Sequence, residues 1–285
     1  MFDQAEIYEY VCVDSTLAYR VFGSGPALLF IHGFPVHGYT WRKLLPELME
    51  NHTCYVVDLP GLGLSQWSDK TNFHFEAQAA RLIDFMKSKN IERCSIIAHD
   101  TGATTARLIA LSEELKVVNL VLFNTEIPGE RPPWIELYQK ASLLPLAHFF
   151  FKMAVTNKYF IRSAMGFKAF YADKSLLENS ENISPYIDLM TSNNERTKGA
   201  LSYLRGCDLN YMDTLQERHK LIQSNVLLIW GVQDVTFPAE HGKKMSKQFR
   251  DAKFFSIENA SLMPHEEQPE EVLAIIKSNW AIKNL

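Results

Sequence analysis

Four side chains that could take part in chemistry follow short apolar runs along this 285-residue chain: His32, Asp58, Asp100 and Asn124. Such runs are typical of strands covered on both faces. Reactive groups gather at the carboxyl ends of parallel strands, so these four are candidates for one site. Asp100 stands out, because a Thr-Gly-Ala sequence follows it and opens a helix-like segment. This pattern predicts a sharp strand-to-helix turn that presents Asp100 as a nucleophile.

Two backbone N–H groups are predicted to face the same cleft. Thr101 directly follows Asp100 at a helix N-terminus, where partial positive charge stabilises an anion. Phe34 follows the strand end at His32, and its N–H could be the second donor. Two such donors can hold a developing oxyanion. We expect His32 to order this loop by hydrogen bonding, and not to be the base.

Apolar strand-like runs and amphipathic helix-like segments alternate along most of the chain. Between residues 27 and 123 the predicted strands are 27–31, 53–58, 94–98 and 117–123, and the predicted helices are 39–50, 75–88 and 102–111. Two strands at 7–13 and 17–22 precede them, and strands 226–230 and 253–257 with helices 239–249 and 269–280 follow. Such alternation predicts an α/β fold with a mostly parallel central sheet and helices on both faces.

The alternation stops between residues 131 and 214, where helical periodicity and many aromatic residues replace the strands. We therefore predict a core made of 1–130 and 215–285 and an inserted helical cap subdomain at 131–214. Most aromatic residues of this segment should pack in its own core. Trp134 and Tyr138 are four residues apart, so they share a helix face and are candidates to line a pocket.

The composition of the chain limits the classes of partner that we expect. The formal net charge is -4 and there is no long Lys/Arg run, which disfavours nucleic acid and an anionic membrane surface and favours a small-molecule substrate or ligand. Four widely spaced cysteines without a C-x-x-C pattern are expected to be reduced thiols. We expect no metal and no cofactor, since no His/Cys cluster is present. The N-terminus lacks a signal-peptide layout, so we expect a cytoplasmic location. The oligomeric state is not predicted.

Five segments, in order along the chain, resemble motifs of the α/β-hydrolase superfamily. They are residues 32–35 (His-Gly-Phe-Pro), 58–65 (Asp-Leu-Pro-Gly-Leu-Gly-Leu-Ser), 98–103 (Ala-His-Asp-Thr-Gly-Ala), 230–234 (Trp-Gly-Val-Gln-Asp) and 266–272 (Glu-Glu-Gln-Pro-Glu-Glu-Val). The resemblance covers nearly the whole chain. It implies the α/β-hydrolase fold, a nucleophile elbow at Asp100 and a helical cap.

Aspartate at the elbow resembles the branch that holds epoxide hydrolases and haloalkane or haloacetate dehalogenases. The resemblance implies that Asp100 attacks carbon in a small, mostly apolar electrophile and forms an ester, which a histidine-activated water then hydrolyses. Asp234 would orient that histidine, with Glu126 as an alternative acid. Thr101 stands where many haloalkane dehalogenases have a halide-binding Trp, which disfavours that activity.

The histidine position departs from the family pattern. The family's histidine lies seven positions before the proline of the last helix, and counting back from Pro269 gives Leu262. His265 is three residues further on and is the candidate for a substitute base, unless it is an ordinary surface residue beside two glutamates. Two hypotheses stay open: a hydrolase with an atypical or missing base, and an impaired homologue that binds a small ligand in the cap pocket.

Overall fold

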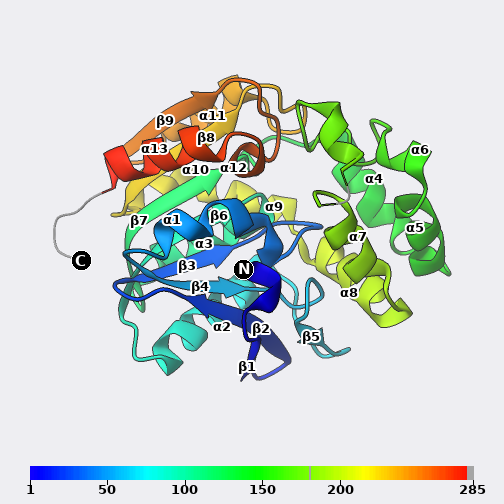
Figure 1. Cartoon of the computed structure of the whole chain (residues 1–285), viewed down its shortest axis with the longest axis horizontal. Helices are drawn as coiled ribbons and strands as arrows, with labels where there is room; N and C mark the ends of the chain where they lie inside the picture. The colour runs from blue at the N-terminus through cyan, green and yellow to red at the C-terminus, as the bar shows by residue number, and fades with distance from the viewer. Residues whose placement is uncertain (180, 281–285) are drawn as a thin grey trace.

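A computed structural model describes residues 1–179 and 181–280 of the chain (Figure 1). Its described part contains one sheet of nine strands, ordered β1-β2-β4-β3-β6-β7-β8-β9, with β5 paired to β2. The pairs β1–β2, β2–β4 and β2–β5 are antiparallel, and the pairs from β4 through β9 are parallel. The predicted α/β fold with a mostly parallel sheet is confirmed.

The strands are β1 Tyr8–Val11, β2 Ser15–Phe22, β3 Ala27–Ile31, β4 Thr53–Val57, β5 Gln66–Trp67, β6 Arg93–His99, β7 Lys116–Phe123, β8 Asn225–Gly231 and β9 Ala252–Ile257. The α-helices of the core are α1 Leu45–Leu48, α2 Phe75–Ser88, α3 Thr101–Leu111, α10 Leu215–Arg218, α11 Ala239–Ser246, α12 Pro264–Glu267 and α13 Pro269–Asn279. Short 3-10 helices are η1 Phe2–Gln4, η2 Gly38–Lys43 and η4 His219–Leu221.

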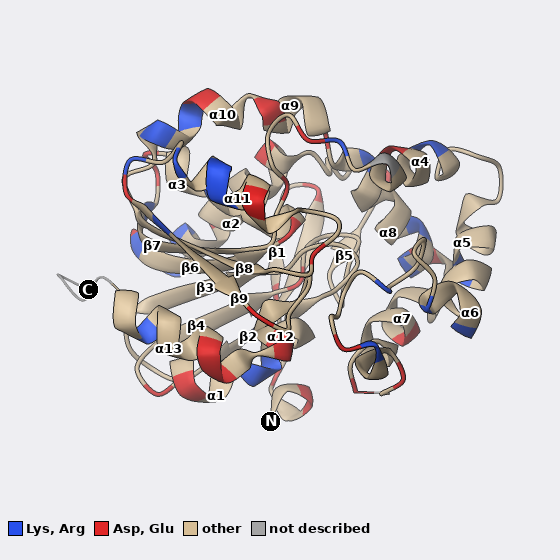
Figure 2. Cartoon of the chain, turned by 90° about the horizontal axis from the view of Figure 1, so that it is seen from above, with Lys and Arg blue, Asp and Glu red and all other residues tan. Residues whose placement is uncertain are grey.

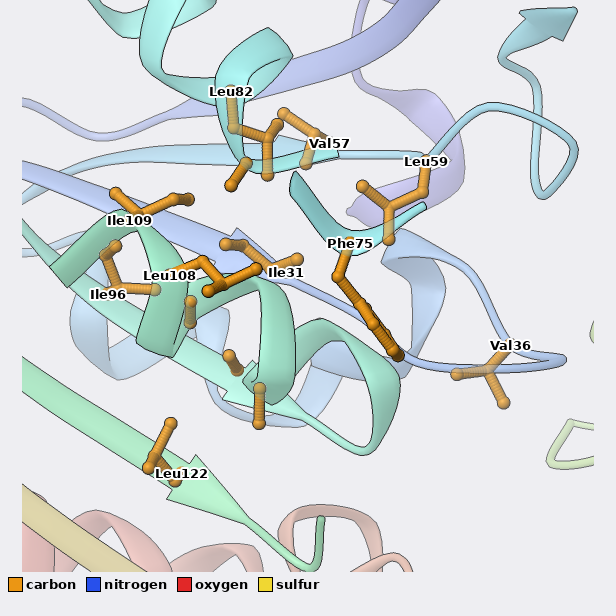
Figure 3. Close-up of a cluster of buried hydrophobic side chains, with 14 of the residues drawn as sticks. Ile31, Val36, Val57, Leu59, Phe75, Leu82, Ile96, Leu108, Ile109 and Leu122 are labelled. Carbon is orange, nitrogen blue, oxygen red and sulfur yellow. The ribbon is translucent and has the colours of Figure 1, made fainter. Parts of the chain in front are cut away.

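Each central strand buries both of its faces, as its apolar run requires. In β3, Leu28 and Phe30 belong to the hydrophobic cluster that includes residues of α1 and α13, whereas Leu29 and Ile31 belong to the cluster that includes residues of α2 and α3. This separation follows from the two-residue side-chain period of a strand. Figure 3 shows part of the second cluster, with Ile31 close to side chains of the helices above the sheet. The two cores hold the strand ends in place.

The predicted helix 39–50 is shorter and broken in the structure. It consists of η2 and then α1, and Pro46 occupies the first turn of α1. Proline has no N–H to donate to the preceding turn, and its ring fits only the start of a helix. The helix therefore restarts at Leu45.

A helical region lies between β7 and β8, at the right-hand end of the molecule in Figure 1. Its elements are α4 Pro133–Ala141, α5 Ala147–Val155, α6 Lys158–Ile161, η3 Lys174–Leu177, α7 Ser184–Thr191, α8 Asn194–Gly206 and α9 Leu209–Asp213. We use "helical region" for residues 131–214. Ser180 of the predicted cap and residues 281–285 of the predicted core lie outside the described residues.

Glu266 of α12 joins the helical region to the core. Its buried carboxylate accepts hydrogen bonds from the hydroxyls of Tyr171 (2.8 Å) and Tyr186 (2.5 Å) in the helical region. From η2, the Thr40 hydroxyl donates at 2.7 Å and the Arg42 guanidinium at 3.2 Å. Among the described residues, Glu266 is the acceptor found for the two tyrosine hydroxyls, whereas Arg42 also donates to the Asn182 side chain at 2.9 Å and Thr40 also contacts His265 at 2.7 Å.

Replacing Glu266 by alanine should destabilise the fold by about 1–3 kcal/mol, because it leaves the buried hydroxyls of Tyr171 and Tyr186 without an acceptor. Urea unfolding followed by circular dichroism measures this free energy. Glu271→Ala, on an exposed position of α13, is the matched control and should change stability by less than about 0.5 kcal/mol. Equal effects of both substitutions would show that the hydrogen bonds to Glu266 contribute little to the stability of the fold.

Candidate active site

Asp100 lies at the turn between β6 and α3 in a backbone conformation that L residues rarely adopt (φ 51°, ψ -132°). Its N–H donates to the carbonyl oxygens of Phe123 (3.3 Å) and Asn124 (3.2 Å) at the end of β7. Its own carbonyl oxygen accepts from the Thr125 hydroxyl at 2.9 Å. A strained backbone persists only where its surroundings hold it, and here the neighbouring strand end does so.

Two glycines allow the elbow to approach the loop after β3. A Cβ atom on Gly33 would lie 2.4 Å from the Cβ and Oδ2 atoms of Asp100, and one on Gly102 would lie 2.2 Å from the carbonyl oxygen of His32. Both distances are shorter than any tolerated contact. The close approach is therefore possible only with glycine at these positions.

The loop after β3 supplies a donor to the nucleophile candidate. The Phe34 N–H donates to Oδ2 of Asp100 at 2.8 Å, and the Thr101 N–H also hydrogen-bonds to this carboxylate. No donor to Oδ1 is found among the described residues. Oδ2 is thus held by the Phe34 N–H, with the Thr101 N–H also close to the carboxylate, in a pocket to which Asp100 contributes.

Tyr203 of α8 reaches the elbow from the helical region. Its hydroxyl and the Thr101 hydroxyl are 2.9 Å apart, and the Thr101 hydroxyl is 3.4 Å from Oδ2 of Asp100. The Tyr203 ring stacks on Phe34 with 6.2 Å between the ring centres. Tyr203 therefore links the helical region to Thr101 and Phe34, the two residues whose N–H groups are predicted to hold an oxyanion.

His32 binds the loop through both ring nitrogens. Its Nε2 accepts from the Leu59 N–H at 2.9 Å, so Nδ1 carries the proton and donates to the Gly33 carbonyl at 2.9 Å. Burial lowers the pKa of His32 to about 4. A neutral imidazole with both nitrogens engaged orders the loop and has no free nitrogen for a substrate.

Glu126 and Arg107 form a charged group behind Asp100. Oε2 of Glu126 accepts from the hydroxyls of Thr104 (2.7 Å) and Thr125 (2.9 Å). The fully buried Arg107 donates to the Thr104 hydroxyl and to the Glu126 carbonyl oxygen. Burial lowers the pKa of Arg107 to about 10, opposed by the charge of Glu126.

Burial and the neighbouring charge of Glu126 raise the pKa of Asp100 well above its usual range. The N–H groups of Thr101 and Phe34 oppose this increase, and Asp234 adds to it. Carboxylates that share a dry site cannot all ionise easily. Asp100 therefore holds its proton to higher pH than an exposed aspartate.

Asp234 follows β8 and is buried without a histidine partner among the described residues. Its Oδ2 accepts from the Asn124 amide at 2.7 Å, and its Oδ1 accepts from the N–H groups of Thr236 (2.7 Å) and Phe237 (3.1 Å). Burial raises the pKa of Asp234 to about 7, although these donors oppose the increase. These donors orient the Asp234 carboxyl, and Asp234 and Asn124 follow the ends of the neighbouring strands β8 and β7.

Leu262 contributes its side chain to the pocket, as does Asp100. Its carbonyl oxygen accepts from Nε2 of His99 at 2.9 Å, and the next N–H, of Met263, donates to the carbonyl oxygen of Phe170 in the helical region. Backbone contacts therefore fix this loop on both sides, with an aliphatic side chain at the position where the resemblance to the family implies a histidine.

His265 lies away from the pocket. It is fully buried, its Nε2 is 2.7 Å from the Thr40 hydroxyl, and its ring lies 4.7 Å from that of Trp41 and 4.9 Å from that of His99. Burial lowers its pKa well below the usual range. The described residues that line the pocket do not include it. The alternative of a solvent-facing residue is wrong, since the side chain has no exposed surface.

A cavity of about 480 Å³ lies over Asp100 and is lined mainly by apolar side chains. This volume is typical of small-molecule sites. Phe34, Thr101, Trp134 and Tyr138 line it as well, and the Tyr138 hydroxyl donates to the carbonyl oxygen of Met165. The structure therefore brings together every predicted site residue except His32, Asp234 and His265, which lie outside the lining.

Sequence reasoning missed Arg107, Tyr203 and the two threonines that hold Glu126. Thr104 lies on α3 one turn after Asp100, and Thr125 follows the end of β7, so the elbow and strand ends could have indicated both of them. Tyr203 is far away in sequence within a region rich in aromatics, where no spacing distinguished it.

An open α/β sheet with a strained acid at a strand-to-helix turn, two backbone donors and an apolar cavity defines a class of hydrolase-like proteins. The chain matches the family model described as alpha/beta hydrolase fold over residues 26–269. The chain belongs to this family, which makes it a hydrolase of the α/β-hydrolase superfamily, as predicted.

Several proteins are similar to this chain. Epoxide hydrolase 2 of Caenorhabditis elegans is 26% identical over 268 residues, which are 87% of this chain and 72% of that protein. Epoxide hydrolase 4 of Homo sapiens is 26% identical over 80% of this chain and 65% of its own length, so the chain spans less than two thirds of that relative. Fluoroacetate dehalogenase of Burkholderia sp is 34% identical over 115 residues, 39% of this chain and 38% of that protein.

Solved structures agree on the fold. The ligand-free structure of the epoxide hydrolase CorEH superposes with a TM-score of 0.77 over 97% of this chain and 99% of that one, at 20% identity. The predicted resemblance to the epoxide hydrolase and dehalogenase branch is confirmed at the level of similar proteins.

Proposed function

We propose that Asp100 is a nucleophile toward small, mostly apolar electrophiles, epoxides or compounds with a carbon–halogen bond, and that the ester it forms is hydrolysed slowly because Leu262 stands at the position of the base. The helical region would act as the cap that closes the pocket. The observation that supports the proposal is the Asp100 carboxylate, which accepts a hydrogen bond from the Phe34 N–H on Oδ2, lies beside the Thr101 N–H and contributes to a mainly apolar cavity.

The first chemical step needs no histidine. An oxygen of the Asp100 carboxylate bonds to the electrophilic carbon while the carbon–halogen bond, or one carbon–oxygen bond of the epoxide, breaks. A halide leaves as the anion. An epoxide oxygen becomes an alkoxide and takes a proton from water.

The second step needs a base. Water attacks the ester carbonyl, and the N–H groups of Phe34 and Thr101 would stabilise the oxyanion. A general base contributes about 10²- to 10⁴-fold to such a step, and Leu262 has no atom that accepts a proton. Glu126 lines the cavity with no bound donor on Oε1 among the described residues, so it would be the weak substitute.

Intact-mass spectrometry tests the proposal. After incubation with a small epoxide, the full mass of the epoxide should be added to the protein, and with a haloacid the mass of the acid less one hydrogen halide. Rapid release of product over many turnovers, without an adduct, would contradict slow ester hydrolysis.

A second candidate function is ligand binding without reaction. The raised pKa of Asp100 favours it, since a protonated carboxyl is a poor nucleophile. It predicts neither adduct nor product, together with saturable binding of small apolar molecules that a bulky residue at Leu204 in the cavity wall would block.

The rate of adduct formation should rise with pH above the range in which an ordinary aspartate ionises. The sign follows from the protonation state: only the ionised Asp100 attacks, and its pKa lies well above the usual value of about 3.9. Measured adduct rates between pH 5 and 9 check this. Glu126→Gln removes one cause of the raised pKa, so its profile should shift to lower pH. A flat profile would mean that Asp100 is already ionised at pH 5.

A further inference from the structure

Helix α5 lies in the helical region at the end of the molecule far from the sheet (Figures 1 and 2). Leu143, Leu144, Leu146, Phe149 and Phe150, at the start of α5 and in the loop before it, are each 53 to 73% exposed. We call these five residues the apolar tip. Monomeric proteins rarely expose so many large apolar side chains together, and such patches mark interaction sites.

Helix α5 has two apolar sides. Phe151 and Val155, four residues apart, line the pocket. Phe149, Phe150 and Met153 point the other way and are more than half exposed. A surface helix normally presents polar side chains to water, and a helix that is apolar on both sides is covered by something else. Water is therefore an unfavourable environment for the outward side of α5.

The sequence around the tip is free of acidic residues. Between Glu136 and Asp173 there are 36 residues without Asp or Glu, and five basic ones: Lys140, Lys152, Lys158, Arg162 and Lys168. Glu136 pairs with Lys140 and Glu178 with Arg162, both at exposed positions. No ion pair of the other three is found in the described part of the chain. This segment is basic in a chain whose net charge is -4.

We propose that the apolar tip docks on an anionic lipid surface. Leu and Phe side chains enter the boundary between head groups and acyl chains, while flanking Lys and Arg residues meet the lipid phosphates. A second copy of the chain is a poorer occupant, because a two-fold interface places identical surfaces together and would bring these cations against one another.

The acid-free segment also forms part of the pocket wall. Phe151, Val155, Phe160, Met165 and Lys168 line the pocket, and all come from this segment. Docking of the apolar tip would therefore place one wall of the pocket close to the lipid. No described helix is long and apolar enough to cross a membrane, so the contact would be peripheral. The expectation of no membrane partner rested on the net charge, which averages over this basic segment.

Vesicle sedimentation tests the docking without any need for turnover. The full chain should bind vesicles of 70% phosphatidylcholine and 30% phosphatidylglycerol at least ten-fold more tightly than pure phosphatidylcholine, and less tightly at 0.5 M NaCl because salt screens the attraction. Leu144→Asp/Phe150→Asp should reduce binding at least ten-fold. Lys152→Glu/Lys158→Glu should remove the preference for phosphatidylglycerol.

Matched controls come from the core. Val13→Asp changes an exposed apolar residue, and Lys243→Glu/Lys244→Glu reverses an exposed basic pair, and both variants should bind as the parent does. Phe150→Trp provides a second measurement. On phosphatidylglycerol vesicles, the tryptophan fluorescence of this variant should show a blue shift relative to that of the parent. Absence of vesicle binding, equal losses in the control variants, or a dimer in ultracentrifugation that Leu144→Asp/Phe150→Asp dissociates would overturn the proposal.

Discussion

Replacing Leu262 by histidine is expected to increase steady-state hydrolysis of small epoxides or haloacids by about 10²- to 10⁴-fold, the usual contribution of a general base. The loop that carries residue 262 is held by its backbone, through the carbonyl bond from His99, so the substitution should leave the loop in place. The new imidazole would have an acid available in Asp234, whose Oδ2 accepts from the Asn124 amide and retains a further lone pair.

The measurement is product release under substrate saturation, with halide or diol as the readout. Leu262→Met, which keeps an apolar side chain of similar size, is the matched control and should behave as the parent. The double variant Leu262→His/Asp100→Asn should be inactive. If the histidine variant is no faster than the methionine variant, a missing base does not limit this protein.

Asp100→Asn should abolish the covalent adduct entirely. The amide keeps the shape of the side chain and an acceptor for the Phe34 N–H, but it has no anionic oxygen to attack carbon. The check is intact mass after long incubation with the same epoxides and haloacids, followed by peptide mapping of the modified residue.

Glu126→Gln is the control for that experiment, since it alters the neighbouring carboxylate and leaves the nucleophile. It should still form the adduct, and at lower pH than the parent. An adduct that persists in Asp100→Asn, or one mapped to another residue such as Cys207 in the cavity wall, would remove Asp100 from the reaction.

The fold could be predicted well from the sequence, because short-range patterns of apolar, polar and turn residues determine where its strands and helices form. The strand Ala27–Ile31 and the helix Phe75–Ser88 have the predicted bounds. Their periodicities differ clearly, and turn residues flank both. Other predicted elements differ in extent: Pro46 breaks the predicted helix 39–50, the predicted helix 239–249 ends at Ser246, and the predicted strand 7–13 is reduced to Tyr8–Val11.

The residues of the site also differ in whether local sequence could predict them. Asp100, Thr101 and Phe34 were predictable because each immediately follows a strand, and the parallel sheet brings the strand ends together. The contact of Tyr203 with Thr101 depends on how the helical region packs on the core, which no local pattern encodes. His265 shows the same limit: its three-residue offset from position 262 places it on α12, and that helix directs the ring toward Trp41 and away from the cavity.

The hydrogen bond from His99 to the carbonyl oxygen of residue 262 has a consequence for how this protein could change over time. Any amino acid except proline offers the same carbonyl without altering the neighbouring N–H contacts, so the bond places few demands on the side chain at that position. Stability and turnover would then be under separate selection. A lineage could lose its base, keep a folded receptor for apolar molecules, and recover catalysis later through substitution at that single position.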